Sequence, residues 1–257
     1  MIHKTAIVDK SAKLDSDVQV GPYSVIGPKV TIGAGSWIGP HVVIQGKTTL
    51  GKNNRIFQFA SVGEAPQDKK YAGEETELVM GDDNVVRECA TIHRGTVQDR
   101  GLTQIGNDNL FMANTHVAHD CTVGDHCIFG NSAAIAGHVV VGSYVIMSGM
   151  CGVHQFCHVG DHSFIAHASM ITKDVPPFVM VTGGSSPTAK GINLEGIKRR
   201  GFNPDEVQAL KRAYKIIYRQ GFLVEEAVAQ LREMAKEAPV VSIFADFLAH
   251  STRGIVR

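Results

Sequence analysis

Histidines in the middle of this 257-residue chain accompany acidic, amide and glycine residues at regular intervals. A neutral histidine can act as general base on a hydroxyl when a carboxylate fixes its tautomer and a backbone N–H stabilises the oxyanion. Alternatively, three histidines can hold Zn²⁺ with one coordination position open. Two evenly spaced series, together with two nearby histidines, contain His119, Gly137, Gln155, Asp120, His138, Phe156, His116 and His154.

Gly137, the member of the series that follows His119, favours the general-base chemistry, because a ligand can approach the backbone of glycine closely. A zinc site needs imidazoles that converge on one point, and spacing alone does not establish such convergence. Both chemistries therefore depend on the elements that position these side chains.

The positioning element is a repeat with a strict period of six residues. An aliphatic or large apolar residue returns at every sixth position from Val8 to Val62, at Met80, Val86 and Ile92, and from Ile105 to Ile171. This period fits neither an α-helix nor a plain strand. It is typical of a parallel β-helix, in which each hexad is one short strand plus a corner and three hexads close one coil. Successive coils lie about 4.8 Å apart, so residues three hexads apart, such as His119 and Gly137, stack in columns.

The repeat is interrupted twice. Residues 63–78 lose the aliphatic period and carry proline, glycine and charged residues, and residues 94–103 are a second excursion, so we expect two loops projecting from the coils. The proline and glycine pairs in DVPPFVMVTGGSSPTAKG, after about residue 175, predict the end of the solenoid. We expect a β-helix over residues 1–190 and a helical domain over 191–257.

Three helices are predicted in the last part of the chain. The sequence Asn203-Pro204-Asp205-Glu206 supplies an N-cap, a proline at the first helical position and a capping-box glutamate, and Gly221 ends that helix. Further helices are expected over about 224–237 and 240–250, covering the open solenoid end. On spacing alone, the stripe Lys211, Lys215 and Arg219 is typical of a solvated helix face.

The composition excludes several classes of partner. The 25 basic and 25 acidic residues leave no net charge, which argues against nucleic-acid binding. No apolar run approaches the roughly 18 residues of a membrane helix, and the segment MIHKTAIVDK lacks the apolar core of a signal peptide. We therefore expect a cytoplasmic protein. Four of the five cysteines occupy small inward positions of the repeat and are interpreted as buried fillers: Cys121, Cys127, Cys151 and Cys157.

Eight segments covering almost the whole chain make it resemble the UDP-N-acetylglucosamine O-acyltransferases of Gram-negative bacteria. They are IFQFASVGEAPQDKKYAG, TIHRGTVQ, NTHVAHDCTVGDHCI, AGHVVVG, VHQFCHVG, KDVPPFV, NLEGIKRRGF and STRGIVR. This resemblance implies a homotrimer of left-handed β-helices with active sites between subunits. It also implies transfer of an (R)-3-hydroxyacyl chain from acyl carrier protein to the 3-OH of the sugar nucleotide, the first step of lipid A biosynthesis. The period of six carries no information about the left hand.

The resemblance further implies a role for each candidate site residue. His119 would be the general base, Asp120 would hold it, and the backbone N–H of Gly137 would polarise the thioester carbonyl. Arg200 and the basic helix stripe become candidates for docking the carrier protein, whose 4'-phosphopantetheine arm is the only cofactor implied; no metal is implied. The substrate-binding positions are Gln67, Asp68, Lys70, His116, His138, His154, Gln155, Asn193, Glu195, Arg199 and Arg200.

One residue bears on the length of the acyl chain, and the sequence leaves alternatives to the proposed reaction. His167 occupies the position that resembles the floor of the acyl groove, where an imidazole fills volume that a glycine would leave open, so we expect a medium-length chain. Two alternative activities are N-acyl transfer to an aminosugar nucleotide and a zinc hydratase on the same fold; a non-catalytic scaffold is the third alternative.

Overall fold

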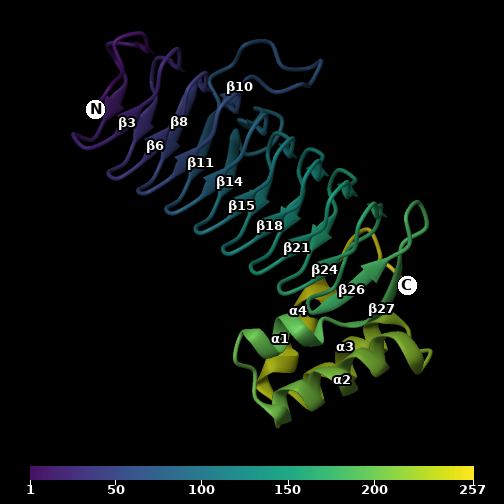
Figure 1. Ribbon diagram of the computed structural model, residues 1–257. Coiled ribbons are helices and arrows are strands. Elements are labelled where there is room, and N and C mark those ends of the chain that lie inside the picture. The colour runs from purple at the N-terminus through teal and green to yellow at the C-terminus, as the bar shows by residue number, and fades with distance from the viewer.

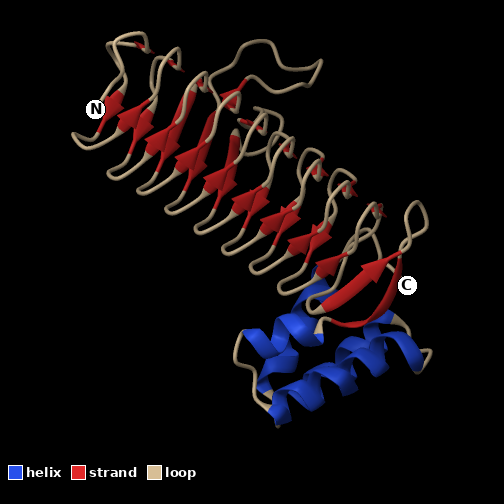
Figure 2. Cartoon of the chain, viewed as in Figure 1, coloured by secondary structure: helices blue, strands red, loops and turns tan.

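The computed structural model describes all residues 1–257 and consists of a long β-solenoid with a small group of helices at one end. Figure 1 shows the coils following one another from the N-terminus to the helices, and Figure 2 shows the strands of one wall in a row. The solenoid is a parallel β-helix, as expected from the hexads, and it is left-handed, as the family resemblance implies. No helix is long and apolar enough to cross a bilayer.

The coils of the solenoid stack into a triangular prism, and its three walls are three sheets of mainly parallel strands. The first sheet contains β1 (Ile7–Val8), β4 (Val25–Ile26), β7 (Val43–Ile44), β10 (Ser61–Glu64), β13 (Thr91–His93), β16 (His116–Val117), β19 (Ala134–Ile135), β22 (Gly152–Val153) and β25 (Met170–Ile171). The second contains β2 (Lys13–Leu14), β5 (Thr31–Ile32), β8 (Lys47–Leu50), β11 (Glu77–Met80), β14 (Leu102–Ile105), β17 (Thr122–Val123), β20 (Val140–Val141) and β23 (His158–Val159). The third contains β3 (Gln19–Val20), β6 (Trp37–Ile38), β9 (Arg55–Ile56), β12 (Val85–Val86), β15 (Leu110–Phe111), β18 (Ile128–Phe129), β21 (Ile146–Met147), β24 (Phe164–Ile165), β26 (Val179–Thr182) and β27 (Thr188–Ile192).

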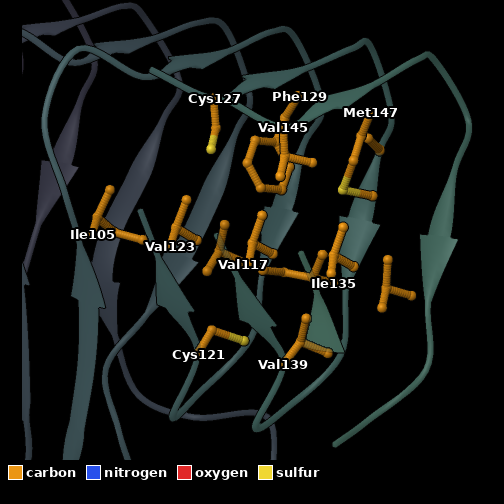
Figure 3. Close-up of a cluster of buried hydrophobic side chains, with 14 of the residues drawn as sticks. Ile105, Val117, Cys121, Val123, Cys127, Phe129, Ile135, Val139, Val145 and Met147 are labelled. Atoms are coloured by element: carbon orange, nitrogen blue, oxygen red, sulfur yellow. The ribbon is translucent and has the colours of Figure 1, made fainter. Parts of the chain in front are cut away.

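The aliphatic residue of each hexad points into the prism and is buried there. Stacked partners are three hexads apart, as in the pairs Val123 with Val141 and Ile135 with Val153. Figure 3 shows these side chains meeting between the walls, with Cys121 and Cys127 among them. Burial raises the pKa of both thiols to about 12, so neither is a thiolate nucleophile at neutral pH. All four inward cysteines are buried fillers, as predicted.

Each corner of the prism holds one residue in the left-handed backbone region, and most of these residues are not glycine. Asp120, His138 and Phe156 have φ values of 59°, 63° and 64° and stack along the corner between the first and second sheets. This conformation costs a non-glycine residue roughly 1–2 kcal/mol, and it persists where the surrounding structure fixes it. The hydrogen bonds between coils supply that constraint, so side chains at this corner have well-defined directions.

Both interruptions of the hexads leave the prism at this same corner. The first loop joins β10 to β11 and the second joins β13 to β14. Strand partners across the loops are further apart in sequence than three hexads, since Ser61 pairs with Thr91 and Thr91 pairs with His116. The extra residues are therefore accommodated outside the stack, beside the column that contains Asp120.

The sequence predicted the end of the solenoid at the proline and glycine pairs, within the residues up to 190 assigned to the β-helix. The proline pair does not end it, because Val181 of β26 pairs in parallel with Ile165 of β24. The strand β27 then pairs antiparallel with β26 and ends the third sheet. The glycine pair Gly183–Gly184 lies in the turn of this hairpin, where both residues have positive φ. Glycines there permit a reversal of the chain rather than the end of the sheet.

Four α-helices and a 3₁₀ turn follow: α1 (Leu194–Arg199), α2 (Pro204–Arg219), α3 (Val224–Ala235), η1 (Pro239–Val241) and α4 (Ser242–His250). The capping box of Asn203 and Glu206 begins α2, as predicted, and the predicted second and third helices correspond to α3 and α4. The helix α1 was not predicted separately. Phe178 of the last coil contacts both Phe202 and Phe244, so the helices cover the end of the solenoid core.

The last residues return to the solenoid and pair with it around buried Asp174. The Asp174 carboxylate accepts hydrogen bonds from the backbone N–H of His158, at 2.8 Å, and from the hydroxyl of Ser251, at 2.6 Å. The backbone N–H of Asp174 donates to the carbonyl of Gly254, and the N–H of Val256 donates to the carbonyl of Asp174. The tail is thus part of the sheet hydrogen bonding rather than a free end.

Candidate active site

His119 and Asp120 form a hydrogen-bonded dyad at the corner between the first and second sheets. Nδ1 of His119 donates to Oδ2 of Asp120 at 2.8 Å. The aspartate side chain is fully buried, and the histidine side chain retains 15% of its exposure. Because the carboxylate occupies Nδ1, a neutral His119 has its lone pair on Nε2. This is the arrangement of a general base.

Two threonines hold Asp120. The backbone N–H and the hydroxyl of Thr96 donate to the carboxylate at 2.9 Å and 2.6 Å, and the hydroxyl of Thr103 accepts from the backbone N–H of Asp120 at 2.8 Å. Burial alone would raise the pKa of Asp120, but the hydrogen bonds from His119 and Thr96 outweigh it and lower this pKa. Asp120 is therefore ionised at neutral pH and can stabilise an imidazolium on His119.

Gly137 lies one coil further along, against the ring of His119. A Cβ atom placed on Gly137 would lie 2.6 Å from Cε1 and 2.8 Å from Nε2 of His119, so any side chain there would displace the imidazole ring. The backbone N–H of Gly137 donates to no other group of the protein. A free N–H on a residue that packs against the basic imidazole can stabilise a developing oxyanion.

A cavity of about 510 Å³ opens beside the dyad along the first sheet. It brings together five of the residues predicted from the sequence, and it also includes His93, which was not predicted. The rest of its lining is small or apolar. The five predicted residues are Gln67, His116, His119, Gly137 and His154.

His93 and His116 are kept neutral within this cavity. Their rings meet edge to face at 5.0 Å, and Nδ1 of His116 lies 2.7 Å from the hydroxyl of Thr91. Burial, with the nearby His116 adding to it, lowers the pKa of His93 to about 4. Burial also lowers the pKa of His116, and His119 adds to that effect. Uncharged imidazoles therefore surround the dyad at neutral pH.

A second cavity, of about 660 Å³, lies on the other side of the same corner. Asp68 and Lys70 from the first loop line it together with His138 and Asp120, so the two cavities meet at the dyad. The ring of His138 stacks on Phe156 with centroids 4.4 Å apart and meets His119 edge to face at 5.1 Å. Arg94 anchors the first loop, because its guanidinium donates to the carbonyl of Gly63 and to the hydroxyl of Tyr71.

Four predicted residues lie apart from this corner. Asn193, Glu195, Arg199 and Arg200 surround a cavity of about 420 Å³ at the corner between the second and third sheets. The guanidinium of Arg200 lies 4.5 Å from the ring centroid of Tyr144, which stacks in turn on His162. One chain therefore does not bring these residues to His119.

Two further predicted residues lie outside these cavities. Gln155 is exposed, and its carbonyl lies 3.1 Å from Nδ1 of His154. His167 is exposed at the corner between the third and first sheets, beside Gly149. The end of the first cavity is lined instead by Met170, on the same coil as His167.

Donor atoms of His119, Asp120 and His138 lie within 4.8 Å of one another, the only such group of three. The Asp120 oxygens already accept from Thr96 and His119. Its carboxylate therefore supports an imidazole rather than coordinating an ion, and Nε2 of the two histidines would be the remaining ligand atoms. Two imidazoles fall short of the three protein ligands of a catalytic zinc site.

The sequence did not predict His93, Thr96 or Asp99 as site residues, although all three lie in the segment TIHRGTVQD. The one feature of the sequence that could have indicated them is that this segment runs into the second loop. Their position in the stack could not be counted, because the interval of three hexads does not hold across that loop.

Comparison with known proteins agrees with this geometry. Residues 102–137 match the model of bacterial transferase hexapeptides, and residues 174–256 match the second domain of UDP-N-acetylglucosamine O-acyltransferases. The chain is 54% identical over 257 residues to the acyl-[acyl-carrier-protein]–UDP-N-acetylglucosamine O-acyltransferase of Stutzerimonas stutzeri, covering all of this chain and 99% of the relative. The chain belongs to the UDP-N-acetylglucosamine O-acyltransferase family.

Solved structures of the family extend the agreement to the fold. The Acinetobacter baumannii protein is 52% identical, with a TM-score of 0.97 over all of this chain and 99% of its own. The Arabidopsis UDP-N-acetylglucosamine acyltransferase is 35% identical, with a TM-score of 0.85 over the full length of both chains. The chain is therefore an acyltransferase with a left-handed β-helix and a C-terminal helical region.

Proposed function

We propose that this protein transfers an (R)-3-hydroxyacyl chain from acyl carrier protein to the 3-OH of UDP-N-acetylglucosamine, the first step of lipid A biosynthesis. The observation that carries the proposal is the buried Asp120–His119 dyad with the free N–H of Gly137 beside Nε2. The full-length relatives are named for this reaction.

The reaction follows from this geometry in two steps. Nε2 of His119 takes the proton of the sugar 3-OH as the oxygen attacks the thioester carbonyl carbon, and the N–H of Gly137 donates to the resulting oxyanion. The C–S bond then breaks, and the imidazolium returns its proton to the thiolate of the phosphopantetheine arm. The products are the sugar ester and the free thiol, so no metal and no cofactor beyond that arm is required.

The experiment is acyl transfer by the wild type and by His119→Ala, with defined hydroxyacyl carrier proteins and UDP-N-acetylglucosamine. The variant should lose roughly 10³-fold or more of kcat, as expected for removal of a general base, and should keep the oligomeric state of the wild type. A fully active variant would refute the mechanism. Faster turnover of a 3-amino sugar nucleotide would favour N-acylation, and stoichiometric zinc in the purified protein would favour a hydratase.

We further infer a homotrimer, because the residues implied for one site lie at two corners of the prism. A neighbouring copy can bring its second–third corner, with Asn193 and Arg199, to the first–second corner of this chain. The third–first corner supports this arrangement, since Tyr23, Phe59 and Met150 are 61%, 60% and 58% exposed along it. Such an apolar edge is typical of a surface that is covered by a partner.

The carrier protein is proposed to dock on α2. A cavity of about 480 Å³ there is lined by five cationic side chains and by no acidic one, which suits an acidic partner. We also propose that the protein acts in the cytoplasm, because its proposed substrates are an acyl carrier protein and a nucleotide sugar. The five side chains are Lys190, Lys211, Arg212, Lys215 and Arg219.

The acyl chain is proposed to lie along the first sheet. From His116, the stacked positions are Ala134, Gly152 and Met170, so small residues form the floor and a long thioether ends it. The Met170 sulfur covers Gly152, lying 2.9 Å from where a Cβ atom would be. The two coil spacings from Ala134 to Met170 amount to roughly 10 Å, which supports the medium-length chain expected from His167.

A further inference from the structure

A second carboxylate–imidazole pair lies next to the catalytic dyad, and its aspartate comes from the second loop. Oδ2 of Asp99 lies 2.8 Å from Nδ1 of His138. The histidine side chain retains 16% of its exposure and the aspartate 38%. The pair therefore repeats the arrangement of His119 with Asp120, one coil further along the corner, but nearer to the solvent.

His138 is fixed on three sides. Asp99 occupies Nδ1, Phe156 stacks on one ring face, and His119 meets the ring at an angle of 89°. No protein group bonds Nε2 of His138, and the side chain lines the cavity that also contains Asp68 and Lys70. With Nδ1 donating to Asp99, a neutral His138 presents Nε2 as a hydrogen-bond acceptor.

We propose that Asp99 is a positioning residue for the sugar nucleotide: it fixes the tautomer and orientation of His138 so that Nε2 accepts a hydrogen bond from a hydroxyl of the bound sugar. This proposal rests on the proposed function. Asp99 touches neither the dyad nor the reacting atoms, because Thr96 and His119 provide the hydrogen bonds to Asp120. Its effect should therefore appear in binding of the nucleotide rather than in the chemical step.

The test compares Asp99→Asn and Asp99→Ala with the wild type in steady-state acyl transfer. Loss of the carboxylate that orients a metal-binding histidine costs roughly 10- to 100-fold; by analogy, and because Asp99 is partly exposed, we expect an effect at the lower end here. We expect KM for UDP-N-acetylglucosamine to rise about tenfold in both variants, with kcat within about twofold of the wild type. The conservative variant Asp99→Glu should recover part of the loss.

A matched control exists at another corner. Asp108 accepts from Nδ1 of His126 at 2.7 Å, so Asp108→Asn removes the same kind of pair outside the three cavities of the site. We expect it to leave KM and kcat unchanged.

A second readout is the ¹⁵N chemical shifts of the His138 ring, assigned by comparison with His138→Gln. Wild-type shifts should show protonation at Nδ1, and Asp99→Asn should lose this preference, because an amide can donate as well as accept. Unchanged KM or an unchanged tautomer in Asp99→Asn would overturn the proposal. An inactive wild-type protein would instead contradict the proposed function itself.

Discussion

The contact between Gly137 and His119 makes Gly137→Ala a sharp test of the catalytic geometry. The added methyl group would lie 2.6 Å from Cε1 of His119, whereas ordinary contact begins at 3.4 Å, so the ring must retreat by about 0.8 Å. That movement also strains the 2.8 Å hydrogen bond to Asp120. A displacement of about 1 Å at reacting atoms can cost about 10²-fold in rate, equivalent to about 2.7 kcal/mol of barrier.

We therefore expect Gly137→Ala to lower kcat by about 100-fold while KM for both substrates changes little. The assay is steady-state transfer with hydroxyacyl carrier protein, together with thermal unfolding. Unfolding should change little, because Gly137 does not have positive φ and alanine can adopt its backbone. Gly149→Ala is the control, since the closest atom to its added methyl would be a carbonyl oxygen at 3.2 Å, only about 0.2 Å inside ordinary contact, and not an atom of the dyad. Wild-type kcat in Gly137→Ala would refute this account of the dyad.

Three further predictions follow from the same structure. Thr96→Val removes a hydrogen bond to an ionised carboxylate worth about 1.5–3 kcal/mol, so both kcat and the unfolding temperature should fall, whereas Thr96→Ser should behave like the wild type. The pKa of His93 is lowered to about 4 in the folded protein. As the pH falls below 6.5, His93 therefore becomes protonated in the unfolded chain while it stays neutral in the folded one. The contribution of this residue to the free energy of unfolding should therefore fall by about 3 kcal/mol as the pH is lowered from 6.5 to 4. Urea unfolding of His93→Gln at a series of pH values should show a correspondingly smaller dependence of stability on pH. In an acyl-chain competition assay, Met170→Gly should shift preference to longer chains, because Met170 lines the end of the first cavity; an unchanged preference would contradict the proposed groove. The family resemblance predicts the same shift for His167→Gly, although His167 lies outside this cavity, and an unchanged preference there would contradict the role that the resemblance implies.

Much of the site was predicted by the rule that residues three hexads apart stack on one another. It placed His119 beside Gly137 and in sequence with Asp120, and the structure brings these three together. It worked because the strands around the site pair at a constant interval of three hexads, from Thr122 with Val140 to Gly152 with Met170. Counting in steps of three hexads failed across the second loop, because Thr91 pairs with His116, more than four hexads later. The contact of Thr96 with Asp120 could therefore not be predicted in this way.

Other features depend on information that a single sequence lacks. The hand of the coil is not encoded in a period. The proline and glycine pairs after residue 175 are compatible with continued pairing and a hairpin as well as with a stop. The parallel pairing of Val181 with Ile165 and its antiparallel pairing with Ala189 distinguish the two. Residues such as Asn193 and Arg199 were predicted from resemblance alone, because they belong to a different corner from His119.

The pairing of the tail with Asp174 has a consequence for the order in which the molecule can be completed during synthesis. The early coils can stack as they leave the ribosome, since each contacts only its neighbours. The last coil cannot, because its buried carboxylate acquires the Ser251 hydroxyl and its backbone acquires Gly254 and Val256 only when the final residues emerge. Until then the buried carboxylate keeps only the hydrogen bond from the backbone N–H of His158, and a buried carboxylate that lacks part of its hydrogen bonding is costly. A chain truncated before Ser251 would therefore form nearly every coil but would leave the end of the solenoid around Asp174 uncovered.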